Sequence, residues 1–231
     1  MNRLRAIYDF LLDTLFPPLC ISCRAQLSRE KSFSGVLCFD CFSSLEINAG
    51  FFRIAAHGKG NPLILGAALN YQSETARNLI HSFKYEGYYS LSKPFANLIM
   101  RHLRLSGLWN FVKKEKFVLV PVPLHRSRLK YRGYNQSEIL AKDIRILSGL
   151  EICDVLVRKK KTKEQAEIKD KNDRLKNVRG CFVLRGKEVV AGKNFMIVDD
   201  VFTSGATIME AARILYKNGA KKVIAVTVAK A

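Results

Sequence analysis

The feature that most constrains the fold of this chain is a regular alternation of short apolar runs with segments of helical pattern. The runs are rich in β-branched residues and lack a polar face, as expected for strands buried on both sides. Strands that alternate with helices form a parallel sheet covered by helices, so an α/β fold is predicted. The expected strands are 63–70, 117–121, 195–198, 223–228 and a short one starting at Val155, and the expected helices are 73–83, 91–105, 135–147 and 207–217.

Residues 195–207 read FMIVDDVFTSGAT, which is an apolar strand, an acidic pair and a turn of small residues before a helix. Ligands of parallel sheets bind at the carboxyl ends of the strands. Small residues let backbone N–H groups surround a phosphate, and the helix N-terminus behind them favours negative charge. Asp199 and Asp200 can accept hydrogen bonds from ribose hydroxyls. The pattern indicates a sugar-phosphate site, and the alternative is a buried strand that ends in an Asp-capped turn.

This segment resembles, over all thirteen of its positions, the signature for phosphoribosyl pyrophosphate (PRPP) of type I phosphoribosyltransferases. The resemblance implies that Asp199 and Asp200 hold the ribose hydroxyls and that Mg²⁺ bridges the pyrophosphate. The 6-oxopurine enzymes carry an acidic general base where this chain has Thr203, which argues against salvage of hypoxanthine or guanine. No catalytic residue is assigned. The residues implied to bind the 5′-phosphate are Thr203, Ser204, Gly205, Ala206 and Thr207.

Four cysteines near the start of the chain follow the pattern C-x2-C-x14-C-x2-C: Cys20, Cys23, Cys38 and Cys41. Two such pairs can close a tetrahedral four-thiolate site, which leaves no open position for chemistry. We therefore expect structural Zn²⁺, with redox dithiols or plain structural cysteines as the alternatives. The domain boundaries expected from this pattern are 1–50 for an N-terminal helix with a zinc ribbon and 51–231 for a phosphoribosyltransferase-like domain.

The net charge favours polyanionic partners. Lys and Arg number 39 and Asp and Glu number 20, so the formal charge is +19. Such an excess suits nucleic acid, anionic lipid or phosphorylated ligands, although a generic basic surface is the alternative. No apolar stretch reaches the roughly 18 residues of a membrane span, so a transmembrane protein is not expected. Residues 1–19 are expected to form an amphipathic helix that packs on the rest of the protein, with docking to a membrane surface or a partner left open.

Two basic segments are further candidates for ligand binding. Residues 121–137 read PVPLHRSRLKYRGYNQS and are expected to contain a basic loop over 125–133. Arg126, Lys130 and Arg132 could contact pyrophosphate, or they could contact single-stranded nucleic acid together with Tyr131 and Tyr134. Between 158 and 179 there are ten basic and four acidic residues, which predicts a mobile loop that closes over a ligand or grips nucleic acid. Plain solvated segments are the alternative for both.

The pieces in order resemble the ComF family of competence proteins, also called ComFC or GntX-like. The resemblance rests on the four cysteines, FKYEG at 83–87, PVPLH with RLKYRGYNQS, the charged segment after 156 and VDDVFTSGAT, and it covers about residues 18 to 230. It implies a role in natural transformation, the handling of imported single-stranded DNA in the cytoplasm. Other DNA-uptake proteins are implied as partners, and peripheral attachment to the inner membrane stays open.

Three functions remain compatible with these residues. The first is a DNA-uptake factor that binds single-stranded DNA and PRPP. The second is a metabolic enzyme that transfers phosphoribose from PRPP to a nucleobase, and the third is a PRPP-sensing regulator without catalysis. The intact acidic pair fits all three, whereas residues 1–115 contain a cysteine pattern in place of a recognisable base-binding hood.

Overall fold

The computed structural model describes residues 17–28, 32–54, 62–163, 168, 170–186 and 189–231. The helix expected over 1–19 lies outside the described residues except for 17–19, which are not helical. The chain there is extended, and Leu19 forms an isolated antiparallel bridge with Gln26.

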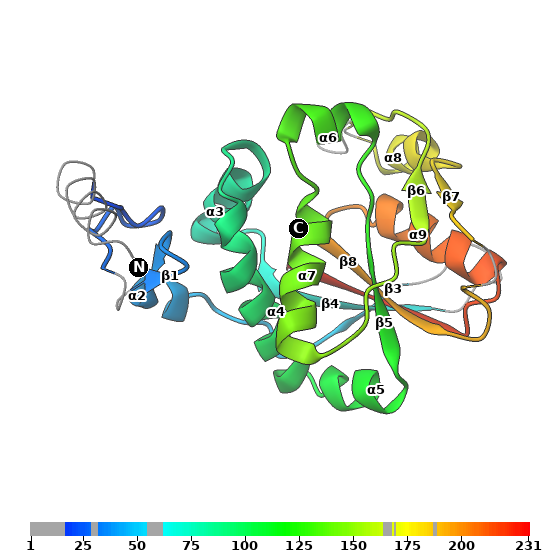
Figure 1. The fold of residues 1–231 in the computed structure, drawn as a ribbon, viewed down its shortest axis with the longest axis horizontal. Helices are drawn as coiled ribbons and strands as arrows, with labels where there is room; N and C mark the ends of the chain where they lie inside the picture. Colours follow the sequence, from blue (N-terminus) through cyan, green and yellow to red (C-terminus); the bar gives the residue numbers. More distant parts are fainter. Residues whose placement is uncertain (1–16, 29–31, 55–61, 164–167, 169, 187–188) are drawn as a thin grey trace, which may run out of the picture.

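A five-stranded sheet is the centre of the molecule (Figure 1). Its order is β3–β4–β9–β8–β5, and the β4–β9, β9–β8 and β8–β5 pairs are parallel. The edge strand β3 pairs with β4 in the antiparallel sense, so the sheet is mixed at this edge. The α/β prediction is confirmed. The strands are β3 (Phe52–Ile54), β4 (Leu63–Asn70), β5 (Phe117–Pro121), β8 (Asn194–Phe202) and β9 (Lys222–Lys230).

The strands are apolar on both faces because each face has its own core. Alternate residues of one strand enter different cores: Met196 and Val198 join the first, whereas Phe195 and Ile197 join the second. In Figure 1, α4 and α7 lie in front of the sheet and belong to the first core. The helices of this core are α3 (Glu74–Tyr85), α4 (Ser92–Leu105), α5 (Leu108–Lys114) and α7 (Gln136–Ser148).

The second core lies under α9 (Ala206–Lys217) and a small two-stranded sheet of β6 (Leu156–Arg158) and β7 (Phe182–Leu184). Between β6 and β7 the chain contains α8 (Lys171–Val178), which belongs to the segment expected to be a mobile loop. This helix lies next to α9, so part of the segment is helical, whereas its mobility and its closure over a ligand stay a prediction.

Two further expectations about local structure were wrong. The segment expected as a basic loop over 125–133 is largely the helix α6 (Arg126–Arg132). His125 caps its start by accepting a hydrogen bond from the Ser127 amide, and Gly133 ends it with a φ of 80°. The strand expected over 195–198 continues to Phe202, so the acidic pair lies within β8 and does not follow it.

The four cysteines belong to a small module at one end of the molecule (Figure 1). It consists of β1 (Ser32–Phe33), β2 (Leu37–Cys38) and α2 (Phe39–Ser43). Its apolar residues Leu27, Leu37 and Phe42 are buried in the same core as α4, and the guanidinium carbon of Arg101 on α4 lies 6.0 Å from the centre of the Phe42 ring. The module therefore packs on the main core, and the domain boundary at 50/51 stays a prediction.

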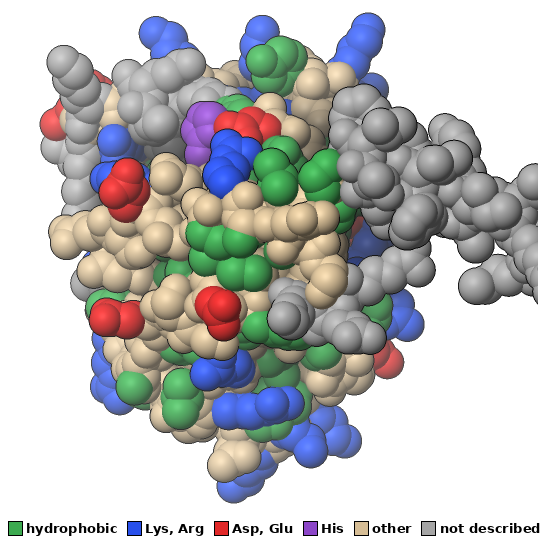
Figure 2. All heavy atoms as spheres, turned by 90° about the vertical axis from the view of Figure 1, so that its left-hand side faces the viewer, with side chains coloured by type: hydrophobic (Ala, Val, Ile, Leu, Met, Phe, Trp, Pro, Cys, Tyr) green, Lys and Arg blue, Asp and Glu red, His purple; other side chains and the backbone are tan. Residues whose placement is uncertain are grey.

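The surface is consistent with the basic composition of the chain. Figure 2 shows one face, on which Lys and Arg side chains gather toward the upper and lower margins with hydrophobic side chains between them. Among the described helices, none has the length and apolar character needed to cross a membrane.

Candidate functional site

A cleft with a volume of about 190 Å³ lies where β5 and β8 end and α9 begins. Its position is the one expected for a ligand of a parallel sheet. All seven residues predicted to bind PRPP line it. The other lining residues include Ile80, His81, Lys84, Tyr85, Arg128, Arg132 and Arg158, which come from α3, α6 and β6.

The N-terminus of α9 forms one wall of this cleft. Gly205 is the N-cap residue and no side chain caps the helix through it. The hydroxyl of Ser204 accepts a hydrogen bond from the Ala206 amide at 3.4 Å, which folds the turn back on itself. The first-turn amides of a helix without a side-chain cap are donors for an anion, and the helix dipole favours its charge.

Gly205 is required at this turn for two reasons. Its φ is 75°, a conformation that side chains with a Cβ rarely adopt. A Cβ at this position would also lie 2.4 Å from an atom of the Phe202 ring. The glycine therefore brings the backbone against Phe202 and leaves the helix N-terminus accessible from the cleft.

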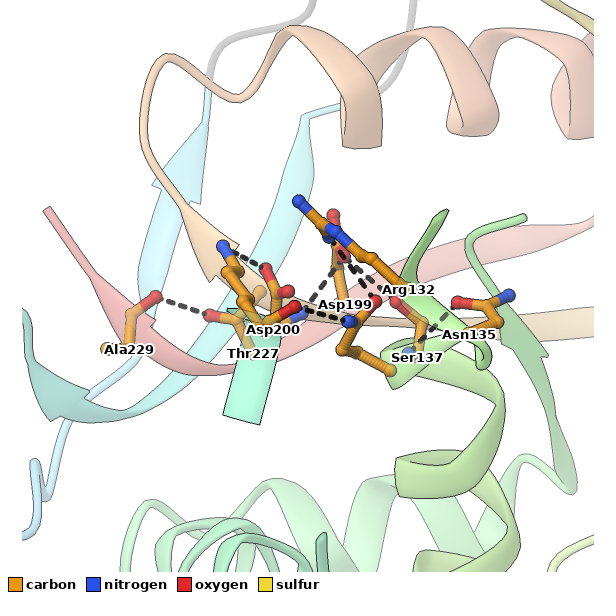
Figure 3. A network of polar contacts seen from close by, with 9 residues as sticks. Arg132, Asn135, Ser137, Asp199, Asp200, Thr227 and Ala229 are labelled. Atoms are coloured by element: carbon orange, nitrogen blue, oxygen red, sulfur yellow. Dashed lines mark hydrogen bonds and ion pairs between the residues drawn. The ribbon is translucent and has the colours of Figure 1, made fainter. Parts of the chain in front are cut away.

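The two carboxylates stand on adjacent residues at the end of β8 and have different partners (Figure 3). One oxygen of Asp199 accepts hydrogen bonds from the Ser137 hydroxyl at 3.0 Å and from the Asp200 amide at 2.9 Å. Asp200, which is 8% exposed, forms an ion pair with Lys84 at 2.9 Å. Ser137 belongs to α7 and Lys84 to α3, so two of the helices of the first core hold the acidic pair in place.

The local electrostatics follow from this geometry. Burial raises the pKa of Asp199 to about 7, and the charge of Asp200 beside it adds to the rise. Burial alone would lower the pKa of Lys84, but the carboxylates of Asp200 and Asp199 outweigh it and raise that pKa above its ordinary value. Lys84 is therefore a cation at neutral pH, whereas Asp199 holds its proton to a higher pH than an ordinary aspartate does. Lys84 compensates only part of the negative charge of the two carboxylates. A cationic ligand, or a transition state that develops positive charge, can compensate the rest.

Lys84 is a site residue that the sequence reasoning did not single out. It lies in the last turn of α3, where its carbonyl accepts a hydrogen bond from Gln136 at 3.3 Å. The Tyr134 hydroxyl donates to the neighbouring carbonyl of Phe83. The FKYEG run contained the only sequence signal for this lysine, and nothing in its local pattern indicated that its partner lies on β8.

The basic residues predicted from the 121–137 segment separate into two groups. Arg132 lines the cleft, and its guanidinium carbon lies 4.8 Å from the centre of the Tyr85 ring. Arg126 and Lys130 are exposed on α6 and do not line the cleft, and their contact with a ligand stays a prediction. Arg128 and Arg158 line the cleft without having been assigned a role from the sequence.

The four predicted cysteines come together in the structure. The sulfur atoms of Cys20, Cys23, Cys38 and Cys41 all lie within 4.8 Å of one another, so they could hold one metal ion. Burial opposes ionisation of Cys20, but hydrogen bonds from the backbone amides of Cys23 and Cys38 outweigh it and lower the pKa of this thiol to about 6. Burial instead raises the pKa of the Cys38 and Cys41 thiols, so the thiols of this cluster do not ionise equally without a metal, and a bound metal ion would displace their protons.

Comparison with known proteins agrees with this architecture. The family model for the phosphoribosyl transferase domain matches residues 129–231. The chain is 27% identical to Competence protein F of Haemophilus influenzae over 209 residues, which cover 89% of this chain and 87% of that protein. It is 28% identical to Competence protein ComFC of Streptococcus pneumoniae over 65% of this chain and 61% of the relative. It is 30% identical to DNA utilization protein YhgH of Escherichia coli over 63% of each chain.

The raised pKa of Asp199 predicts a specific pH dependence of stability. An unfolded chain releases this proton near pH ~4, whereas the folded protein holds it to about pH 7. The folded state therefore binds more protons over this interval, and the free energy of unfolding falls as the pH rises through it. Asp199→Asn removes the ionisation and keeps the acceptor oxygen, so we expect it to stabilise the protein by about 1–2 kcal/mol at pH 8 and much less near pH 4.5.

Thermal unfolding of the wild type and the variant at both pH values measures this effect. Asp154→Asn is the control, because Asp154 is exposed and forms only a long ion pair of 3.6 Å with Arg185 among the described residues. A stabilisation by Asp199→Asn that is equal at the two pH values would contradict the assignment.

Proposed function

Since this chain belongs to the ComFC competence family and contains a phosphoribosyltransferase domain, we propose that it binds imported single-stranded DNA in the cytoplasm and binds PRPP in the cleft at the end of β8. The observation that carries the PRPP part of this proposal is that the N-terminus of α9, whose N-cap residue is Gly205, shares one cleft with two carboxylates. The helix N-terminus suits the phosphate of a phosphorylated sugar, and the two carboxylates suit its hydroxyls.

Each part of PRPP has matching groups in the cleft. The first-turn amides of α9 and the Thr203 and Ser204 hydroxyls donate hydrogen bonds to the 5′-phosphate. Asp199 and Asp200 accept hydrogen bonds from the ribose hydroxyls, and Lys84 keeps Asp200 ionised and oriented through their contact at 2.9 Å. Mg²⁺ bound to the pyrophosphate neutralises part of its charge, and such an ion keeps substrate phosphates and waters as most of its ligands.

For DNA we propose a surface made of the turn after α3 together with α6, and we call it the tyrosine–arginine surface. It contains Tyr88, Tyr89 and Tyr131, of which Tyr89 is 62% and Tyr131 is 85% exposed. The centre of the Tyr89 ring lies 6.2 Å from that of Tyr134, which follows α6 in the chain. This ring contact connects the turn after α3 with the end of α6. Exposed rings stack on bases, and Lys and Arg beside them contact the phosphate backbone.

The tyrosine–arginine surface adjoins the cleft. Tyr85 and Arg132 line the cleft and also contact each other across α3 and α6. A DNA strand held on this surface would therefore pass the mouth of the PRPP site.

Transfer of phosphoribose to a free nucleobase is the second candidate function. The observation that favours it is the acidic pair, Asp199 and Asp200, held in place in the cleft.

We propose that the four-cysteine cluster binds Zn²⁺. Four sulfur ligands from two C-x2-C turns suit zinc in tetrahedral coordination, with all positions closed. In its described residues the module contains two short strands and a five-residue helix, so the metal would supply much of its folding energy. Its role would be to brace the module against α4.

Removal of one thiolate should release the metal. Cys23→Ser is the sharpest variant, because Cys23 is exposed and its loss removes a ligand with little loss of packing. We expect one zinc per chain in the wild type by elemental analysis, a strongly reduced content in Cys23→Ser, and a lower melting temperature. Cys153→Ser, outside the cluster, should retain the zinc. An equal metal content in the two variants would rule out the cluster as the zinc site.

Removal of both carboxylates should abolish PRPP binding. Calorimetric titration with Mg–PRPP should give saturable binding for the wild type and none for Asp199→Ala with Asp200→Ala. Asp143→Ala is a control on α7, because Asp143 bonds to Ser92 outside the cleft. Undiminished binding by the double variant would exclude the cleft as the PRPP site. Release of pyrophosphate with one particular free base would favour the nucleobase enzyme.

Loss of exposed rings should weaken DNA binding. Fluorescence anisotropy of a labelled single-stranded oligonucleotide should show binding that falls steeply with salt. Tyr88→Ala with Tyr89→Ala should weaken it by about tenfold or more, since each stacked base contributes ~1–3 kcal/mol. Phe51→Ala removes an exposed ring elsewhere and should have no effect. If wild-type protein fails to bind at low salt, the DNA part of the proposal is wrong.

A further inference from the structure

A second hollow, with a volume of about 440 Å³, lies between the cysteine module and the helices α4 and α7. It shares no lining residue with the PRPP cleft. Its size falls within the roughly 300–1,000 Å³ that is typical of small-molecule sites. We call it the module pocket: Phe33 and Phe39 line it from the module, Asn97 lines it from α4, and Asp143 and Ile146 line it from α7.

The walls of the module pocket are largely apolar and open to solvent. Phe39 is 44% exposed and Ile146 is 78% exposed. The Phe33 ring stacks on the buried Phe42 ring with 4.4 Å between their centres, and the Phe39 ring stands edge-on to Phe33 at 5.9 Å. Because the buried Phe42 ring anchors this cluster, the aromatic wall is formed before a ligand arrives. A flat ligand can stack on such a wall at little cost in side-chain ordering.

Two polar side chains give this apolar pocket hydrogen-bond acceptors. One carboxylate oxygen of Asp143 accepts a hydrogen bond from the Ser92 hydroxyl, which fixes the side chain and leaves its other oxygen for a ligand. Asn97 donates from its amide nitrogen to the carbonyl of Lys93 at 3.0 Å, and its amide oxygen is a second acceptor. Two acceptors in one pocket match an amino group, which carries two hydrogens.

A nucleobase with an exocyclic amino group meets these requirements together. Such a base is flat and stacks on aromatic rings, and its amino group donates hydrogen bonds to carboxylate and amide oxygens. A phosphate group does not suit the pocket, because the Asp143 carboxylate repels it. An apolar side chain of a partner protein would contact the walls but would leave that carboxylate without a donor.

The module pocket also continues the tyrosine–arginine surface. Tyr89 belongs to that surface, and Lys93, which lines the pocket, follows it by four residues near the start of α4. Four residues span at most ~14 Å of chain, so a strand that stacks on the tyrosines reaches the pocket with a base farther along. Lys93 is exposed and suits the phosphate backbone of a strand that enters there.

We propose that the module pocket binds one base of single-stranded DNA and selects a base that carries an exocyclic amino group. This inference rests on the proposed DNA function and extends the DNA-binding surface to the cysteine module. The base stacks against the Phe33 and Phe39 rings, with Ile146 on the side of α7. Asp143 and Asn97 accept hydrogen bonds from its amino group.

Two labelled homo-oligonucleotides of equal length, one of deoxycytidine and one of deoxyuridine, test the inference. Cytosine has an amino group at the ring position where uracil has a carbonyl oxygen. By fluorescence anisotropy we expect the wild type to bind the deoxycytidine strand about tenfold more tightly, as for a well-formed hydrogen-bonded contact to a base. Asp143→Asn should lose this preference, since its amide also presents a donor, while affinity for the deoxyuridine strand stays within about twofold or rises.

Asp154→Asn, which neutralises an exposed carboxylate outside the pocket, is the matched control and should keep the preference. Phe39→Ala is the second variant and tests the pocket if Asp143→Asn does not fold, because the Phe39 ring is partly exposed. It should weaken binding of the deoxycytidine strand by about fivefold or more, through loss of stacking. Phe51→Ala removes an exposed ring outside the pocket and is its control.

Each further outcome decides between the pocket and the wider proposal. Wild-type protein that binds both strands equally would overturn the inference and would favour an apolar side chain of a partner protein as the occupant. A preference for deoxycytidine that survives in both pocket variants would overturn it as well. Wild-type protein that binds neither strand at low salt would refute the proposed DNA function itself.

Discussion

The ion pair between Lys84 and Asp200 is the interaction on which the arrangement of the site depends. A carboxylate that is only 8% exposed at the end of a central strand requires a compensating charge. Lys84 provides that charge from the last turn of α3, at 2.9 Å. The contact fixes the end of α3 against β8, and Ser137 does the same for the start of α7. Because two helices and a strand meet at these carboxylates, the cleft has a defined shape before any ligand enters.

The cleft is lined by side chains of both charges. Asp199 and Asp200 line it together with the first turn of α9 and three arginines, Arg128, Arg132 and Arg158. The proposed ligand, PRPP, likewise combines a neutral sugar with two phosphorylated ends. The cleft therefore offers donors for phosphate oxygens and acceptors for hydroxyls within one hollow.

The basic character of the chain has more than one physical use. Arg132 and Arg158 line the cleft, whereas Arg126 and Lys130 are exposed on α6 beside exposed tyrosines. The same short helix therefore belongs both to the cleft and to the tyrosine–arginine surface. The cysteine module lies at the far side of α4 and joins the core through Phe42, which makes it a structural extension of the same body.

The sequence by itself determined the elements whose signals are local. The apolar runs at 63–70 and 117–121 are strands with those bounds, and the cysteine spacing predicted a cluster that the structure assembles. The acidic pair and the small-residue turn likewise predicted where the cleft would be. Local patterns suffice for these features because a strand buried on both faces requires a run of apolar residues, and a tight turn requires small residues at particular positions.

Only the tertiary structure decided which distant residues meet. Asp199 and Asp200 continue β8 because Lys84 and Ser137, far away in the chain, offset the cost of their burial. The helix α6 was missed because none of its residues is buried, so it has no apolar period to detect. Arg158 resembles the other cations of its segment in sequence, and only its place between α6 and β7 buries it in the cleft. Pairing across the crossovers of a parallel sheet depends on the whole chain, and no local pattern records it.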